Sequence, residues 1–310
     1  MSTDAGAQVV FLVNPASANG STGRHWPELE ARARALGLAG ETRTSEHPGH
    51  LVGLAEEAAT EGVSTIVAVG GDGTVHEIVN GIMRSPHAGE VTLALVARGT
   101  GKDCARSLRI PRRFEAAVRA ARDGEVRTLD VGRATYRAPD GSEETAYFAN
   151  FAGAGISGAI ARRANASSKA MGGRMSFFVA TLTVFARWRA APMTATVGDE
   201  RRSGPMFEVL AMNGDYTAGG MWAAPDAKPD DGLLDVVLIG DVTKADFVRT
   251  FPKIYRGRHL SHPKIELLRG PSVRVETEHP LPVVLDGEQP GTTPATFELL
   301  PRALRVRGAA

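Results

Sequence analysis

A glycine-rich segment after the apolar, β-branched run at residues 65–69 has the residue types of a phosphate-binding loop. It reads Gly70-Gly71-Asp72-Gly73-Thr74 and leads into an amphipathic pattern at 75–83. Glycines let a backbone close around an anion, and a following helix N-terminus adds N–H groups and a positive dipole end. Asp72 would repel a phosphate unless a divalent cation or a hydroxyl lies beside it. The segment predicts a phosphate site with a cation; the alternative is an ordinary turn in which Asp72 or Thr74 caps the helix.

The glycine-rich segment lacks the spacing of the two commonest nucleotide motifs. A P-loop ends in Gly-Lys-Ser/Thr, which is absent after Thr74, and the dinucleotide fingerprint needs a different glycine spacing. A dehydrogenase is therefore excluded.

Two further loops offer polar groups beside glycines. Asn14 and Ser17 follow the apolar run at 9–13, and Thr100 and Lys102 follow the run at 92–97. Each loop alone could be a capped surface loop or a solvated basic turn. Three such loops at strand ends favour one shared binding site.

The first 130 residues alternate apolar runs with amphipathic stretches, which predicts a parallel sheet with helical crossovers. Strands are expected at 9–13, 41–45, 65–69, 92–97 and 126–131, and helices at 26–36, 50–60, 75–83, 103–108 and 113–122. Ligands bind beyond the carboxyl ends of such strands, so the three loops should converge there.

After residue 133 short β-rich runs and turns predict a largely antiparallel domain. Strands are expected at 147–151, 194–197, 207–212, 234–239, 272–276 and 282–285, helices at 175–189 and 244–255, and a strand pair at 295–307.

Composition narrows the class of protein. The 310 residues are 43% hydrophobic and 23% charged, which fits a globular chain with a substantial core and excludes a disordered one. The net charge of +1 argues against a nucleic-acid coat protein, so no nucleic-acid partner is expected. Cys104 is the one cysteine, which precludes an intrachain disulfide and fits a reducing, cytoplasmic setting. No signal peptide or membrane-spanning run is expected, so any membrane contact would be peripheral.

Two acidic positions near the C-terminus have the chemistry of a general base. Asp286 and Glu288 lie two residues apart around Gly287. A carboxylate can accept the proton of a poorly nucleophilic hydroxyl. An extended segment would put both on one face, whereas a turn at Gly287 would let them diverge. Asp72 is a competing base candidate.

Together these motifs resemble the diacylglycerol kinase catalytic-domain family, specifically the soluble bacterial lipid kinases. The resemblance spans nearly the whole chain, although the glycine-rich motif alone is shared with NAD kinases and phosphofructokinase-like proteins. It implies an α/β ATP-binding domain with a parallel sheet at 1–132, with a C-terminal return at 292–310. It also implies a largely antiparallel β-sandwich lipid-substrate domain at 133–291. The implied reaction transfers the γ-phosphate of ATP to a lipid hydroxyl, first of all that of diacylglycerol, giving phosphatidic acid.

The resemblance also assigns residues. The implied ATP contacts are Asn14, Pro15, Ser17, Thr44, Gly70, Gly71, Asp72, Gly73, Thr74, His76 and Thr100. Implied Mg²⁺ ligands in the Asp-rich segment 225–235 are the Asp231 carboxylate and backbone carbonyls at Lys228 and Leu233; the alternative is a solvated turn before a strand. Glu288 is implied as the proton acceptor, with Asp286 orienting it or sharing its role.

This chain departs from the family pattern at three positions. Lys102 stands where the family usually has Asn, Ala18 where Gly commonly follows Ser17, and His76 where Asn is frequent. These departures are the motive for a competing hypothesis, a catalytically silent nucleotide- or lipid-binding regulator. A sphingoid or ceramide kinase and an NAD kinase also compete with a diacylglycerol kinase.

A basic, aromatic segment at 162–189 could contact an anionic membrane, which would place the protein at the inner membrane face. Its basic residues are Arg162, Arg163, Lys169, Arg174, Arg187 and Arg189, and Phe177, Phe178, Phe185 and Trp188 lie among them. Phe178, Leu182 and Phe185 have helical spacing, which predicts one shared face. The alternative is a helix packed on the core. A second basic stretch at 244–264 raises the same two possibilities, and homodimerisation is left open.

Overall fold

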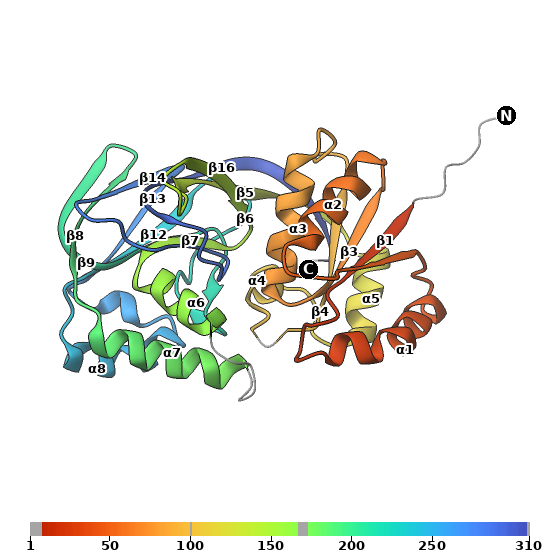
Figure 1. The fold of residues 1–310 in the computed structure, drawn as a ribbon, viewed down its shortest axis with the longest axis horizontal. Coiled ribbons are helices and arrows are strands. Elements are labelled where there is room, and N and C mark those ends of the chain that lie inside the picture. Colours follow the sequence, from red (N-terminus) through yellow and green to blue (C-terminus); the bar gives the residue numbers. More distant parts are fainter. Residues whose placement is uncertain (1–7, 100, 167–172, 309–310) are drawn as a thin grey trace. The chain divides into compact units, whose positions relative to one another are not determined.

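The chain divides into two compact units. The computed structural model describes residues 8–99, 101–166 and 173–308 (Figure 1). Unit 1 comprises Met1–Leu129 and Arg302–Ala310, and unit 2 comprises Asp130–Pro301. Two long strands, β5 (Val126–Arg137) and β16 (Thr292–Arg307), run through both boundaries.

Unit 1 is a parallel sheet with helices between its strands. The strands are β1 (Val9–Val13), β2 (Glu41–Thr44), β3 (Thr65–Gly70) and β4 (Thr92–Ala97). The helices are α1 (Ser21–Ala35), α2 (His50–Thr60), α3 (Asp72–Arg84), α4 (Asp103–Ser107) and α5 (Phe114–Asp123). The strand order is β2-β1-β3-β4-β16, every pairing parallel, with β4 joined by Arg305–Arg307 of β16.

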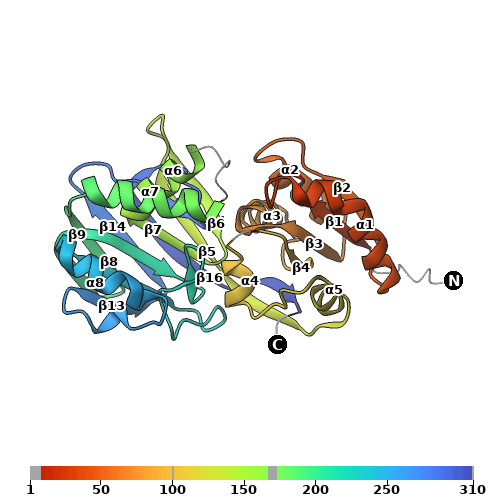
Figure 2. The same ribbon diagram turned by 90° about the horizontal axis from the view of Figure 1, so that it is seen from below.

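Both faces of this sheet are covered, which explains why its strands β1, β3 and β4 are apolar at successive positions rather than alternate ones. Phe11 and Val13 of β1 pack with Trp26 and Leu29 of α1 and Val118 of α5. Helices α2 and α3 pack against each other on the opposite face (Figure 2). The carboxyl ends of β1, β3 and β4 are thus held at one edge of a rigid sheet.

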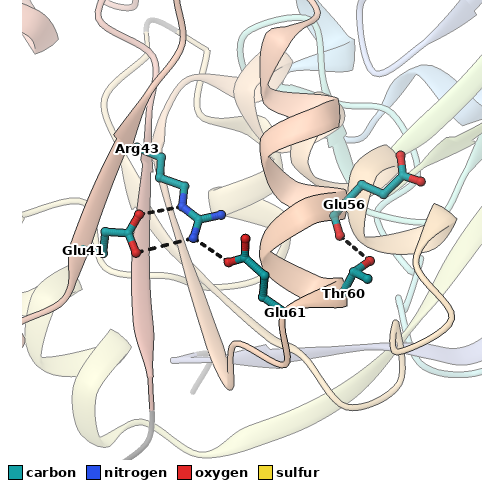
Figure 3. Close-up of polar contacts among 5 residues, drawn as sticks. All are labelled: Glu41, Arg43, Glu56, Thr60 and Glu61. Atoms are coloured by element: carbon teal, nitrogen blue, oxygen red, sulfur yellow. Dashed lines mark hydrogen bonds and ion pairs between the residues drawn. The ribbon is translucent and has the colours of Figure 1, made fainter.

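An ion-pair network fixes the edge strand β2 (Figure 3). Arg43 Nε lies 2.7 Å from Glu41 Oε1, and Arg43 Nη2 lies 2.5 Å from Glu61 Oε2 just after α2. The bond to Glu41 holds the pKa of the Arg43 guanidinium above its usual range, with Glu61 adding to the effect. Thr60 Oγ1 donates to Glu56 O at 2.7 Å in the last turn of α2. The two contacts of Arg43 tie β2 to the end of α2, and Thr44 follows Arg43 as the last residue of β2.

Unit 2 is built from antiparallel strands around a large apolar core. Its strands, besides parts of β5 and β16, are β6 (Glu143–Phe148), β7 (Phe151–Gly155), β8 (Ala191–Val197), β9 (Glu200–Met212), β10 (Tyr216–Thr217), β11 (Met221–Trp222), β12 (Leu234–Gly240), β13 (Ile265–Gly270), β14 (Ser272–Thr277) and β15 (Val283–Leu285). Its helices are α6 (Ile156–Ala166), α7 (Gly173–Arg187), α8 (Lys244–Ile254) and the 3₁₀ turn η2 (His259–Ser261). Phe148, Val209, Val236 and Phe297 lie in the core at 0% exposure.

The long strand β9 organises this unit. Its first half pairs with β8, its second half pairs with β7, and β12 runs along its other edge. Only the second half, Met206–Met212, is buried throughout. The sequence predicted a strand at 207–212 alone because the first half is polar and solvated.

Most predicted elements are present, but several boundaries are wrong. Helix α1 begins at Ser21 rather than at residue 26, after Gly20 in a left-handed conformation, so Pro27 lies inside the helix and not near its start. The run at 147–151 is not one strand, because β6 ends at Phe148 and β7 begins at Phe151. The tail is one strand, β16, rather than a strand pair: Ala295–Glu298 pair with β14 and Arg305–Arg307 with β4.

The shared face predicted for α7 is wrong where the structure describes it. Phe185 is buried against Phe207 and Phe247, whereas Leu182 is 48% exposed. Lys169 and the side chains of Arg174, Phe177 and Phe178 lie outside the described residues. Among the described helices, none is long and apolar enough to cross a bilayer.

Candidate active site

The three loops predicted to converge do so at the carboxyl edge of the unit 1 sheet. Asn14 N donates to Val69 O at 3.0 Å, and Arg98 N donates to Gly70 O at 2.6 Å. A Cβ on Gly99 would lie only 2.5 Å from Gly71 Cα, so the two backbones can approach this closely only because residue 99 is glycine. The edge is therefore a continuous backbone surface from β1 to β4.

Side chains tie the first loop to the glycine-rich loop. Asn14 Nδ2 donates to Thr74 Oγ1 at 3.1 Å, and Asn14 Oδ1 accepts from Ala16 N at 3.0 Å. Thr74 is buried and fills the space beside Gly70, where a Cβ would lie 2.2 Å from its hydroxyl oxygen. The N-cap position of α3 is Gly71, which has no side-chain oxygen to accept the N–H groups of the first turn. A helix N-terminus of this kind suits an anion.

Asp72 joins the glycine-rich loop to the loop after β4. Its Oδ1 accepts from Cys104 N at 3.0 Å, in the first turn of α4. A Cβ on Gly101 would lie 2.7 Å from Asp72 Oδ2, so glycine at 101 leaves room for the carboxylate in this position. One oxygen of Asp72 is thus engaged in positioning α4, which weakens its candidacy as the general base.

Two of the departures from the family pattern lie in left-handed backbone conformations. Ala18 has φ 52° and Lys102 has φ 58°. Glycine and asparagine adopt this conformation most easily, and they are the types the family pattern has at these positions. Both residues therefore adopt a backbone conformation that Gly and Asn favour, although the residue types differ.

The other predicted nucleotide residues have varied surroundings. Ser17 Oγ donates to Asn14 O and contacts Thr22 Oγ1 at 2.6 Å, and Pro15 O accepts from Gly23 N at 3.1 Å. Their polar groups thus shape the first loop. Thr44 is exposed at the end of β2, and His76 is half-buried in α3. Thr100 lies outside the described residues.

In unit 2, Asp286 and Glu288 form a two-residue hairpin after β15. Leu285 N donates to Glu288 O and Glu288 N to Leu285 O, both at 2.9 Å. Asp286 and Gly287 have φ 49° and 97°, as a type I′ turn requires. The turn makes the two carboxylates differ: Glu288 is exposed and Asp286 is half-buried.

The Asp286 carboxylate is held by three backbone N–H groups. Its Oδ2 accepts from Ala149 at 2.8 Å, and its Oδ1 accepts from Asn150 at 3.0 Å and Phe151 at 2.9 Å. Asp286 N also donates to Phe151 O at 2.9 Å. Because these donors occupy its oxygens, Asp286 is suited to fixing the hairpin that carries Glu288.

The N–H groups of residues 149–151 and the Asp286 carboxylate that they hold form a clamp. Sequence reasoning missed the polar side chains that support this clamp. Asn213 Nδ2 donates to Asp130 O and Ala149 O, and Asn150 Nδ2 donates to Tyr216 O at 2.7 Å. Asn213, Asn150 and Asp130 are all at most 4% exposed. The sequence does hold one signal for these residues: each is a polar residue inside or beside an apolar run, and a buried polar side chain needs hydrogen-bond partners.

The Asp-rich turn lies elsewhere in unit 2 and is also anchored by Asp130. Asp130 Oδ2 accepts from Gly232 N at 2.7 Å, and Asp130 N donates to Pro229 O at 2.8 Å. Asp231 Oδ1 accepts from Leu233 N at 3.1 Å, and its Oδ2 lies 2.6 Å from Arg269 Nη2. The turn therefore has a defined shape, with Asp231 in an ion pair.

The chemistry of this turn fits a hard divalent cation. Asp235 is fully buried with its Oδ2 lacking a hydrogen-bond partner, and it lies 3.2 Å from Arg269 Nε. Burial raises the pKa of Asp235, Arg269 opposes that effect, and the charges of Asp231 and Asp226 add to it. Because Arg269 is shared between Asp231 and Asp235, a divalent cation would relieve the repulsion among the carboxylates. It would have to displace Arg269 from Asp231.

Two family descriptions match the chain. The diacylglycerol kinase catalytic domain matches residues 8–134, and the YegS C-terminal NAD kinase beta sandwich-like domain matches 150–308. The diacylglycerol kinase of Bacillus subtilis (strain 168) is 26% identical over 96% of this chain and 94% of its own length. A probable lipid kinase YegS-like protein of Chromohalobacter salexigens is 31% identical over 84% of this chain and 81% of its own length.

The fold is shared with solved structures. A crystal structure of a diacylglycerol kinase from Bacillus anthracis str. Sterne aligns with a TM-score of 0.71 at 24% identity, covering 97% of this chain and 96% of its own. The predicted fold class, an α/β domain with a parallel sheet followed by a β-sandwich-like domain, is confirmed.

The fold and the two family matches define a lipid kinase. The chain belongs to the diacylglycerol kinase family, with the YegS-type C-terminal domain. It is accordingly an enzyme that takes ATP as co-substrate and a lipid as acceptor.

Proposed function

We propose that this kinase transfers the γ-phosphate of ATP to the hydroxyl of diacylglycerol, giving phosphatidic acid. The observation that carries the proposal is the meeting of three loops at the carboxyl edge of the unit 1 sheet. The Asn14 side chain is hydrogen-bonded to Thr74, and the backbone of Gly99 packs on that of Gly71. The similarity to the diacylglycerol kinase of Bacillus subtilis over nearly the whole chain supports this acceptor. We keep residues 1–132 with 292–310 as the ATP-binding domain and 133–291 as the lipid domain within this proposal.

The reaction needs an anion site and a base. Backbone N–H groups at the start of α3 would hold the phosphates, where the helix dipole favours negative charge. Glu288 would accept the proton of the lipid hydroxyl, whose oxygen bonds to the γ-phosphorus as the bond to the β-phosphate oxygen breaks and ADP leaves. Asp286 would act as a positioning residue, since its oxygens already accept three N–H groups.

A bound Mg²⁺ would neutralise negative charge and order the turn that it occupies. The Asp231 carboxylate and the carbonyl oxygens of Lys228 and Leu233 are the proposed ligands, in a turn that Asp130 holds in place. Carboxylate and carbonyl oxygens are the donors that a hard cation prefers.

Phosphate transfer from labelled ATP to a panel of lipids in mixed micelles tests the proposal. The lipids are diacylglycerol, a sphingoid base and ceramide. NAD is tested as an acceptor in a separate reaction without micelles. We expect labelled phosphatidic acid from the wild type and a loss of about 10²-fold or more in Glu288→Gln, since general-base catalysis is worth about 10²–10⁴-fold. Glu278→Gln, at another exposed glutamate of unit 2, is the matched control and should keep full activity.

Each other outcome assigns a different function. Label in a sphingoid base, ceramide or NAD instead would replace diacylglycerol as the acceptor. ATP binding without transfer in either Glu288 form would favour the silent regulator.

We further propose that α7 and α8 contact an anionic membrane, which would place the enzyme at the inner membrane face. Among the described residues, the four large apolar side chains with the greatest exposure are Val179 and Leu182 on α7, and Val248 and Tyr255 on or next to α8. The two helices are joined by stacking of Phe185 on Phe247, 3.6 Å between ring centroids.

The α8 helix has the stronger membrane character. Its aromatic rings follow one another at helical spacing, Phe247 to Phe251 at 5.0 Å and Phe251 to Tyr255 at 6.0 Å. No residue of this helix is buried, and basic residues accompany the rings. These basic residues are Lys244, Arg249, Lys253 and Arg256. Apolar rings among cations suit an anionic interface.

Co-sedimentation with phosphatidylglycerol vesicles tests this surface. Val248→Asp should weaken vesicle binding severalfold and leave ATP binding unchanged. Thr145→Asp adds the same charge at an exposed position of β6 and is the control. Equal vesicle binding by both variants would exclude α8 from the membrane contact.

A further inference from the structure

A cavity of about 190 Å³ opens in unit 1 beside the loops described above. Its apolar wall includes Val96 at the end of β4 and Phe114 of α5, and Ala18 of the first loop lies at its side. Its remaining lining is strongly basic: Arg98, Lys102 and Arg112 all border it, and no acidic residue does among those described. A cavity that holds a single water has a volume of roughly 10–15 Å³, so this space admits a polyatomic ligand.

The three cations that border this space have no ion-pair partner among the described residues. Among the residues that the structure describes, no ion pair or side-chain hydrogen bond joins Arg98, Lys102 or Arg112 to another group. The Nε of Arg98 is buried and has no hydrogen-bond acceptor. A buried guanidinium N–H without an acceptor is costly, and an anionic ligand would remove that cost.

The pKa of Lys102 reflects the neighbouring positive charges. Burial lowers its pKa first, and the charges of Arg98 and Arg112 lower it further. Asp72 opposes the effect, but its Oδ1 already accepts from Cys104 N at 3.0 Å. Lys102 also adds an ammonium group at a position where the family pattern has a neutral Asn. The site therefore holds an excess of positive charge.

We propose that Arg98, Lys102 and Arg112 form a phosphate-binding subsite in this cavity. Two guanidinium groups and one ammonium group suit a phosphate dianion, because arginine pairs with two phosphate oxygens at once and lysine adds a point charge. The phosphate comes from one of two sources: the phosphate chain of the nucleotide held by the adjoining loops, or a free phosphate or pyrophosphate. The subsite belongs to unit 1 alone, so it stands whether or not diacylglycerol is the acceptor.

Calorimetric titration of the full-length chain with sodium pyrophosphate, without Mg²⁺ or nucleotide, tests the subsite. We expect saturable binding that weakens as salt is raised from low to high concentration, because exposed charges are screened. Lys102→Asn and Arg98→Gln should each weaken binding on the order of tenfold, since hydrogen bonds to charged groups contribute that much. Lys102→Asn suits the left-handed backbone, so it should fold normally.

Arg113→Ala is the matched control, because Arg113 is the exposed neighbour of Arg112 and does not line the cavity. It should bind pyrophosphate as the wild type does. A repeat with a saturating non-hydrolysable ATP analogue separates the two sources: competition assigns the subsite to the nucleotide's phosphates, and simultaneous binding assigns it to a free anion. Absence of binding in the wild type, or equal binding by wild type, Lys102→Asn and Arg98→Gln, would overturn the proposal.

Discussion

Replacing Asp286 with Asn should separate the positioning role of this residue from the proposed catalytic role of Glu288. The carboxylate accepts three backbone N–H groups at 2.8, 3.0 and 2.9 Å. An asparagine keeps one oxygen, which can still serve Asn150 and Phe151, but its amide nitrogen then faces the N–H of Ala149. Asparagine tolerates the left-handed backbone, φ 49°, so backbone strain is matched.

The magnitude follows from the bonds that change. A hydrogen bond to a charged group contributes about 1.5–3 kcal/mol, and one such bond is lost. The two that remain become neutral and weaken. Together the free energy of unfolding should fall by about 3 kcal/mol.

Urea unfolding followed by tryptophan fluorescence measures this change. Trp188 and Trp222 lie in unit 2, so the signal includes the clamp's own unit. Asp286→Asn should lower the urea midpoint, while Glu288→Gln keeps the wild-type midpoint and loses phosphate transfer. A wild-type midpoint for Asp286→Asn would refute the clamp, and a lowered midpoint for Glu288→Gln would refute the division of roles.

Three further outcomes are expected. Burial raises the pKa of Glu208 from 4.5 to about 7, so the folded state keeps this proton at pH values where the unfolded state loses it. The free energy of unfolding of the wild type should therefore fall by about 3 kcal/mol as pH rises from about 4.5 to about 7, at about 1.36 kcal/mol per pH unit. Glu208→Gln should flatten that dependence in urea titrations at several pH values, and a slope unchanged by the substitution would contradict the assignment. Ala18→Gly should raise thermal stability by up to about 1 kcal/mol, because φ is 52° there; a lower melting temperature would show that the loop carries no such strain. Arg43→Lys should cost about 1 kcal/mol in urea by losing its two-sided contact with Glu41 and Glu61, whereas Arg34→Lys on exposed α1 should have no effect.

Local patterns were enough to predict the architecture and the loops that meet at the edge of the unit 1 sheet. Runs such as 92–97 are apolar at nearly every position, which is typical of strands buried on both faces, and β4 has those bounds. Glycines before helices located the loops that meet at the sheet edge, because strand direction alone brings the carboxyl ends together. The Asp286-Gly287 pair is a strong turn signal, and the hairpin is present.

Tertiary contacts decided what each polar group does. Asp72, Asp130 and Asp286 have the same chemistry in sequence, yet each accepts backbone N–H groups from segments far along the chain. The polar first half of β9 became a strand through pairing with β8, for which no apolar pattern was needed. Arg98 and Arg112 lie fourteen positions apart and border one cavity only because the end of β4 and the start of α5 meet there. The sequence pattern shows which side chains avoid water, because burial is periodic along a helix or strand. The partners of a buried charge depend on which elements pack together, and the packing of the elements is decided by the whole chain.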